Sequence, residues 1–234
     1  MAVDLSTKRF LLPRINPEGV RFVVIAALLG AVLTVATPLI FGVRFLWGYG
    51  TLFTFALTYA VYLFFRDPER VQPDDENAVL SPADGYVCLL REIPLPKELG
   101  RGDDSAPVWC VSVFMTVLDV HVNRMPFAAT IEKAVYVPGA FFNASLDKAS
   151  EKNERMIYLT RTDSGKELAF VQIAGLVARR IVRFAKEGDR LGRAERFGLI
   201  RFGSRVDVYL PQGVKPMVKV GQKMVAGETV LASL

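Results

Sequence analysis

Two uncharged apolar stretches near the N-terminus constrain this chain more than any other feature. Residues 23–43 (VVIAALLGAVLTVATPLIFGV) and 45–65 (FLWGYGTLFTFALTYAVYLFF) contain no charged residue. A helix of about 20 residues crosses the hydrocarbon core of a bilayer, whereas a buried helix in a small domain normally keeps a polar face. We therefore predict two transmembrane helices joined by a tight hairpin. A hairpin that re-enters one leaflet is the alternative. A cleaved signal peptide fits less well, because the first run is long and follows a charged leader.

The charges around these runs indicate an orientation. Basic residues stand before the first run and after the second, with one cation between the runs: Lys8, Arg9, Arg14 and Arg21, then Arg66 and Arg70, and Arg44. Because cytoplasmic loops carry the excess of Lys and Arg, we predict both termini and the downstream domain on the cytoplasmic side of the cell (inner) membrane. The net charge of +5 does not favour nucleic-acid binding, since the cations do not gather in runs interleaved with aromatic residues.

The rest of the chain has the composition of a folded domain. We divide the chain into a basic cytoplasmic leader (1–22), the two spans (23–65) and a C-terminal domain (66–234). Short β-branched or alternating runs predict strands over 85–91, 108–115, 130–137, 156–161, 168–173, 205–210, 215–220 and 229–232, and 176–184 fits a strand or a short helix. Many short strands separated by turn residues favour a mainly β fold, a compact barrel or sandwich.

The end of the chain adds detail to this fold. The segment VKVGQKMVAGETVLASL (218–234) resembles the hairpins of small barrels that carry biotin or lipoate, and ADGYV (83–87) resembles the opening strand of such barrels. No Lys stands in the modifiable tight turn with flanking Met. The likeness is therefore interpreted as shared architecture only.

One histidine and two cysteines limit the metal and redox chemistry. A zinc peptidase needs two or three imidazole ligands, which His121 alone does not supply, so no metal site is predicted. Cys88 and Cys110 have no CxxC spacing, which excludes a zinc ribbon or a thioredoxin-like motif. Each lies in an apolar run, which favours two buried thiols in a reducing compartment. A disulfide between them stays open.

The strongest functional signal is a group of separated motifs. The pair Gly203–Ser204 lies between two strand-like runs and is, alone, ordinary turn chemistry. Three further segments are LSPADGYV (80–87), MTVLDVHVNRMP (115–126) and NASLDKASEKNER (143–155). Together with FFRDPER (64–70), they resemble the phosphatidylserine decarboxylases, in particular the short membrane-associated form. The resemblance extends from about Phe64 to the C-terminus, in that family's order and spacing.

The resemblance implies a self-processing pyruvoyl enzyme. In that family the Ser of the Gly-Ser pair attacks the preceding carbonyl, the chain is cut by elimination, and the Ser becomes a pyruvoyl group. Here the cut falls between Gly203 and Ser204, giving a β chain (1–203) and an α chain (204–234). The pyruvoyl ketone forms a Schiff base with phosphatidylserine and takes up the electrons released as carbon dioxide leaves, which yields phosphatidylethanolamine in phospholipid biosynthesis.

The family's other site residues match this chain only in part. The resemblance implies His121 as the proton donor in decarboxylation, and as a candidate base for Ser204. Asp84 matches the acid that orients the processing base, while Asp119 either caps a turn or holds His121. Longer members have a second His three residues after the first, where this chain has Arg124. The Asp–His–Ser relay is therefore not carried over intact, and how Ser204 is activated stays open.

Other interpretations remain at this stage. The same machinery could act on archaetidylserine or another serine-headed lipid, and a non-enzymatic membrane-tethered barrel module is the alternative from a different class. In the polar stretch 143–155, which is either a solvated loop or a headgroup-binding loop, Lys148 and Arg155 are candidate anion partners. A homodimer is left open, because edge strands of a partly open barrel could pair.

Overall fold

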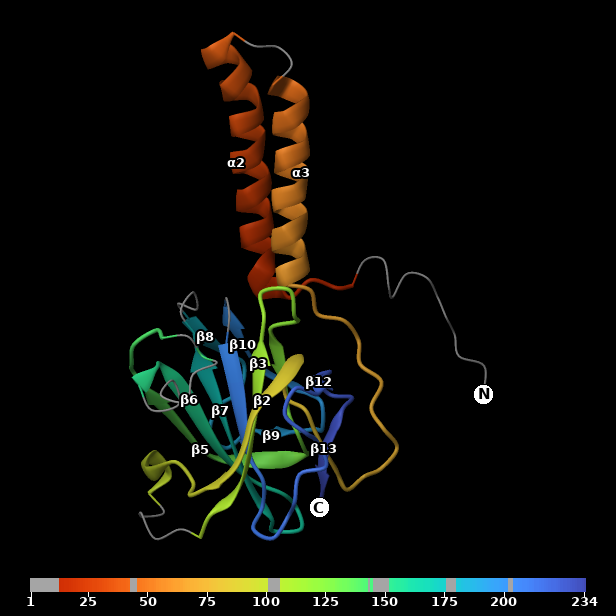
Figure 1. Cartoon of the computed structure of the whole chain (residues 1–234), viewed down its shortest axis with the longest axis vertical. Helices are drawn as coiled ribbons and strands as arrows, with labels where there is room; N and C mark the ends of the chain where they lie inside the picture. Colours follow the sequence, from red (N-terminus) through yellow and green to blue (C-terminus); the bar gives the residue numbers. More distant parts are fainter. Residues whose placement is uncertain are drawn as a thin grey trace. The chain divides into compact units, whose positions relative to one another are not determined.

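The computed structural model describes residues 13–42, 46–100, 106–142, 144, 152–175, 180–201 and 204–234. The chain divides into two compact units, residues 1–69 and 70–234. In the described residues, the first unit contains two helices and the second consists mainly of β strands (Figure 1). The expected mainly β domain after an apolar N-terminal helix is confirmed.

The described part of the first unit contains a pair of helices, α2 (Pro17–Phe41) and α3 (Leu46–Phe64), that lie side by side (Figure 1). The Asn16 side chain caps α2 by accepting a hydrogen bond from the Glu18 N–H, and Pro17 occupies the first turn, where no N–H is needed. Gly42, with a left-handed φ of 66°, ends the helix. α2 thus begins six residues before the first apolar run.

Small and hydroxyl side chains let the two helices approach closely. A Cβ at Gly30 would lie 2.4 Å from Thr54 Cγ2, and one at Gly50 would lie 3.1 Å from Thr34 Cα. The Thr34 and Thr54 hydroxyls are hydrogen-bonded at 2.9 Å. Among the described residues, one helical stretch, Pro17–Ile40, is long and apolar enough to cross a membrane. α3 covers the second predicted span, whose crossing stays a prediction.

The elements of the second unit with described bounds are short strands and one 3₁₀ turn. They are β1 (Ala78–Leu80), β2 (Gly85–Ile93), η1 (Lys97–Leu99), β3 (Val108–Met115), β4 (Val122–Arg124), β5 (Ala129–Val137), β6 (Arg155–Arg161), β7 (Glu167–Ala174), β8 (Arg180–Arg183), β9 (Arg190–Leu191), β10 (Arg196–Arg201), β11 (Ser204–Tyr209), β12 (Lys223–Met224) and β13 (Val230–Ser233).

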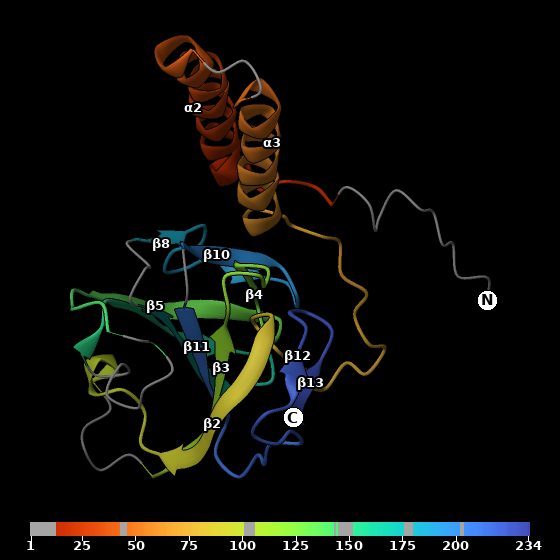
Figure 2. The ribbon, with the colours of Figure 1, turned by 45° about the horizontal axis from the view of Figure 1, so that its top comes forward.

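These strands form antiparallel sheets of eight, three and two strands. The largest has the order β12-β2-β3-β11-β7-β6-β5-β9, the second β4-β10-β8 and the third β1-β13. β11 pairs with β3, beside which it lies in Figure 2, and on its other side with β7. A short strand near the C-terminus therefore occupies the middle of the largest sheet.

The side chains of β11 alternate between the two faces of the large sheet. Val206 and Val208 belong to the larger core cluster, to which strands of all three sheets contribute, and Tyr209 belongs to a second cluster on the other face. Because side chains alternate along a strand, Ser204 lies on the face of the larger core. Arg205 and Asp207 lie on the face of the second.

Both cysteines have free thiols. Cys110 is fully buried, and Cys88 is partly buried with its Sγ 3.5 Å from the Ser112 carbonyl oxygen. Burial raises the pKa of both thiols, to about 11 for Cys88. The buried-thiol interpretation is confirmed for Cys110, whereas Cys88 is only partly buried, and the two cysteines form no disulfide.

One predicted strand is wrong. Residues 215–220 contain no strand, because Pro216 has no N–H for a ladder. A single backbone bond, from Met217 N–H to Leu231 O at 2.7 Å, holds this segment to β13. The region 176–184 was predicted as a strand or a short helix. Residues 176–179 lie outside the described part, and β8 forms a strand in the remainder.

Candidate active site

Ser204 is the first residue of β11 and is fully buried. The alternating run RVDVY that follows it favours a strand, and the ladder pairs Ser204 with Met115 of β3 and Ala174 of β7. Its Oγ lies 3.9 Å from Met115 Sδ. Gly203, the other residue of the predicted cleavage site, lies outside the described residues. The hydroxyl is thus held in a dry position at the start of a central strand.

His121 is also fully buried, directly after a turn that Asp119 stabilises. The Asp119 carboxylate accepts hydrogen bonds from the Thr116 N–H (2.8 Å) and hydroxyl (2.7 Å). The Asp119 carbonyl oxygen lies 2.9 Å from His121 Nδ1. Because a carbonyl only accepts, Nδ1 carries the proton, and Nε2 is the basic nitrogen of the neutral ring. Asp119 therefore caps the turn and also orients His121.

Backbone pairing brings these two residues toward the same end of the sheets. The turn that leads to His121 begins directly after Met115, which pairs with Ser204. β4 follows His121 and pairs with β10, where Ile200 N–H donates to the His121 carbonyl oxygen at 3.4 Å. β10 lies directly before the segment that leads into Ser204.

Asp84 has a different surrounding. Arg70 Nη2 donates to both of its carboxylate oxygens, at 2.8 and 2.9 Å, and the Ala226 N–H donates to Oδ1 at 2.8 Å. The pair is largely buried, with side chains 8% (Arg70) and 15% (Asp84) exposed. Within the described part of the chain, its hydrogen bonds go to these two residues, and none goes to His121 or Ser204.

Arg124, which stands where longer relatives of the resembled family have a second His, is buried in β4. Its Nη1 donates to the Ala194 carbonyl oxygen at 3.1 Å, and its backbone N–H donates to Pro82 O at 2.9 Å. Pro82 lies in the turn that contains Asp84. The strand that follows His121 is therefore tied to the Asp84 turn through the backbone.

Two buried amides beside Ser204 were not found from the sequence. Asn123 and Gln172 are fully buried, and Gln172 Nε2 donates to Asn123 Oδ1 at 2.8 Å. Asn123 Nδ2 lies 3.6 Å from Met115 Sδ, the atom that Ser204 Oγ also approaches. The sequence feature that could have pointed to Gln172 is an amide inside an apolar run, FVQIA (170–174). A partner 49 residues away is not visible in a local pattern.

A buried ion pair follows Ser204 on the other face of β11. Arg205 Nε and Nη2 each donate to the Asp207 carboxylate at 2.7 Å, and both residues are 1% exposed or less. Arg205 Nη1 also donates to the Ala144 carbonyl oxygen at 3.3 Å. The pair thus connects the start of β11 with residue 144, which lies in the predicted headgroup-binding stretch.

Of the two candidate anion partners in that stretch, Lys148 lies outside the described residues. Arg155 is buried, and its Nη2 donates to Glu98 Oε1 at 2.5 Å. Arg155 and Glu98 line a cavity of about 390 Å³ on the Arg205 face of the large sheet, together with Asp207. Arg155 is therefore engaged in an ion pair and does not face Ser204.

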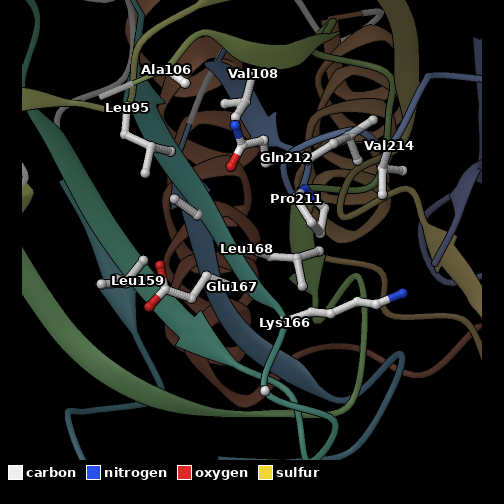
Figure 3. Close-up of a pocket in the computed structure, with 13 residues that line it drawn as sticks. Leu95, Ala106, Val108, Leu159, Lys166, Glu167, Leu168, Pro211, Gln212 and Val214 are labelled. Atoms are coloured by element: carbon white, nitrogen blue, oxygen red, sulfur yellow. The ribbon is translucent and has the colours of Figure 1, made fainter. Parts of the chain in front are cut away.

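A cavity of about 590 Å³ lies at the far end of β11. Figure 3 shows Leu168, Pro211 and Gln212 among the side chains around it. Pro211 and Gln212 follow the last residue of β11, whereas Ser204 is its first. Ser204, His121 and Asp84 do not line this cavity, so it is distinct from the candidate site.

Comparisons with known proteins agree on one family. Residues 57–232 match the family model described as phosphatidylserine decarboxylase. A phosphatidylserine decarboxylase proenzyme of Novosphingobium aromaticivorans is 52% identical, with 95% of this chain and 87% of the relative aligned. Proenzymes of the same name from Ruegeria pomeroyi and Zymomonas mobilis are 53% and 48% identical, covering 96% and 97% of this chain and 97% and 89% of those relatives.

Proposed function

The chain belongs to the phosphatidylserine decarboxylase family, and on this premise we propose that it works with a pyruvoyl group made from its own Ser204. The enzyme is a carboxy-lyase synthesised as a proenzyme. It converts phosphatidylserine to phosphatidylethanolamine and carbon dioxide in phospholipid synthesis. The position of Ser204 is the observation that carries the proposal: a buried hydroxyl at the first residue of a central strand.

The surroundings of Ser204 suit such a group. Its side chain lies against the Met115 thioether, an apolar and adaptable neighbour for the methyl group into which the Ser204 Cβ is converted. Ser204 is paired with a neighbouring strand on each side, so this pairing would hold it in place after the chain is cut between Gly203 and Ser204. When formed, the pyruvoyl group supplies an electrophilic carbonyl that withdraws the electron pair left behind as carbon dioxide departs.

Self-cleavage proceeds in two steps on Ser204. Oγ loses its proton to a base and attacks the Gly203 carbonyl carbon, and the Gly203–Ser204 C–N bond breaks as the nitrogen takes up a proton, which leaves an ester. A base then removes the Ser204 Cα proton, and the Cβ–Oγ bond breaks to release the Gly203 carboxylate. The enamine that remains moves its N–H proton to Cβ, which becomes a methyl group, and water then replaces the nitrogen of the resulting imine, which leaves as ammonia.

We assign proton transfer to His121. Its Nδ1 proton is held by the Asp119 carbonyl, so Nε2 accepts a proton from Ser204 during cleavage and later delivers one to the substrate carbon that has lost carbon dioxide. Asp84 acts as a positioning residue for the processing base. Its turn is bonded to β4 through Pro82 and Arg124, directly after His121.

The finer organisation is part of the same proposal. A leader (1–22), two spans (23–65) and a cytoplasmic catalytic domain (66–234) in the cell membrane would hold the site beside its lipid substrate. The apolar stretch Pro17–Ile40 supports membrane association. Three sheets around one core cluster support a compact barrel or sandwich with hairpins like those of biotin- and lipoate-carrying domains. A homodimer stays a prediction.

The test follows carboxyl-labelled phosphatidylserine in detergent micelles with the full-length protein. We expect labelled carbon dioxide and phosphatidylethanolamine from the wild type. Phenylhydrazine should stop the release and become attached to the fragment that begins at residue 204. His121→Ala should lower turnover about 100-fold or more, and Ser204→Ala should abolish it. Release by Ser204→Ala, or release that phenylhydrazine leaves unchanged, would refute the proposal. Faster release from archaetidylserine would favour the alternative substrate.

A further inference from the structure

We infer that Asn123, oriented by Gln172, donates a hydrogen bond to Ser204 Oγ during self-cleavage. This inference rests on the proposed function, because it assigns a role in the formation of the pyruvoyl group. It also addresses how Ser204 is activated in a chain that has Arg124 in place of a second His. Asn123 would be a catalytic residue of the cleavage reaction, and Gln172 a positioning residue that acts through it.

The geometry is a continuous row of buried side chains from three strands and the end of a fourth. Gln172 on β7 donates to Asn123 Oδ1 on β4 at 2.8 Å. Asn123 Nδ2 then lies 3.6 Å from Met115 Sδ at the end of β3, and Ser204 Oγ lies 3.9 Å from the same sulfur. All four residues are 0% exposed. The amide donor and the hydroxyl thus both lie within 4 Å of one sulfur atom.

The donor capacity of Asn123 is poorly used in this arrangement. A primary amide has two N–H donors, and a thioether sulfur is a weak acceptor. Within the described part of the chain, Gln172 Oε1 is buried without a hydrogen-bond partner. A buried polar group without a partner lowers stability, because it has given up its hydrogen bonds to water. Two apolar residues would avoid this cost, so the presence of two amides here points to a task beyond packing.

The direction of the Asn123 amide is fixed by its neighbour. Because Gln172 Nε2 donates to Asn123 Oδ1, the Asn123 amide turns its Nδ2 donor toward Met115 Sδ. A Cβ at Gly198 would lie 2.8 Å from Gln172 Nε2, so the absence of a side chain there leaves room for this amide. The donor end therefore faces the sulfur that Ser204 Oγ also approaches.

A donor in this place serves both steps of self-cleavage. Ser204 Oγ gains negative charge when its proton leaves for attack on Gly203, and again when the Cβ–Oγ bond breaks and the oxygen departs in the Gly203 carboxylate. An N–H group aimed at that oxygen in a water-free site stabilises both charges, and such donors are worth about 100- to 1,000-fold in rate. Met115 is unbranched and flexible, so its sulfur can move aside.

The experiment measures the rate of chain cleavage after cell-free synthesis of the full-length protein in detergent. Asn123→Ala should cleave about 100-fold more slowly than the wild type. Gln172→Glu should also be slow, because an ionised carboxylate accepts from Asn123 Nδ2 and turns Oδ1 toward Ser204. The matched control is Thr160→Val on β6, which removes a buried hydroxyl bonded to Leu168 O at 2.9 Å, and should cleave at the wild-type rate.

A second variant separates donation from packing. Asn123→Asp keeps the size of the side chain but loses the donor while ionised. Because a protonated carboxyl donates, its cleavage rate relative to the wild type at the same pH should rise as the pH falls. Wild-type cleavage by Asn123→Ala, or a slow Asn123→Asp that does not recover at low pH, would overturn the inference. An uncleaved wild type, or a cleaved Ser204→Ala, would instead refute the proposed function itself.

Discussion

Arg205 and Asp207 are the first two charged residues after the proposed cut, and they form a fully buried ion pair. A buried pair contributes little net stability compared with apolar residues of the same volume, but removing one partner leaves a charge without compensation. The pair also holds Ala144 through its carbonyl oxygen. We therefore interpret it as the group that fixes the beginning of the α chain.

Asp207→Asn should destabilise the second unit by about 3–5 kcal/mol, because Arg205 keeps its charge in a buried position. Urea denaturation of the detergent-solubilised protein, followed by tryptophan fluorescence, measures this loss. The control is Asp163→Asn, which breaks the exposed pair with Arg190 and should hardly change stability. Equal stability of the two variants would contradict the interpretation.

At the residue scale, the sequence led to Ser204 and His121 because a short motif surrounds each of them. The turn role of Asp119 was also foreseen, and the structure adds that its backbone carbonyl orients His121. The Asn123–Gln172 amide pair and the Arg205–Asp207 ion pair were not foreseen. Their meaning depends on which strand face is buried and on strand neighbours, which the local sequence does not contain.

At the scale of elements, β2 and β3 approach each other through Gly85. Its φ of 138° is rarely adopted by other residues, and a Cβ there would lie 2.0 Å from the Phe114 carbonyl oxygen. Phe114 is adjacent to Met115, which pairs with Ser204. The glycine that follows Asp84 therefore sets the spacing of two strands next to the candidate site.

Gly85→Ala should lower the thermal stability of the second unit and slow self-cleavage, because β3 must shift to admit the methyl group. Gly213→Ala is the matched control: its φ is 80°, but a Cβ there meets nothing within 4 Å. It should show only the cost of a left-handed backbone conformation with a side chain, about 1–2 kcal/mol. Similar melting temperatures for the two variants would show that the close contact with Phe114 is unimportant.

Most of the longer strands were predictable because their apolar residues alternate or cluster, as in β3, β6 and β7. The error at 215–220 arose because Val218 and Val220 fit a strand pattern, while Pro216 removes a ladder donor. The strands β4, β9 and β12 are two or three residues long and carry no periodic signal. Their existence depends on partners distant in sequence.

At the scale of the whole molecule, the proposed α chain cannot be separated from the β chain without dismantling the core. Residues 204–234 supply β11 in the middle of the large sheet, β12 beside β2, and β13 beside β1. Every residue of β11 is buried. A cut before Ser204 should therefore leave one folded particle with two chains, whose fragments separate only in denaturant.

The most direct test is the intact mass of the purified protein, measured for the wild type and for Ser204→Ala after size-exclusion chromatography in detergent. The wild type should elute as one peak and yield two masses, residues 1–203 and a 204–234 fragment with a pyruvoyl group in place of its N-terminal serine. Ser204→Ala should remain one chain of about 25.9 kDa. A single uncleaved mass for the wild type would contradict the account.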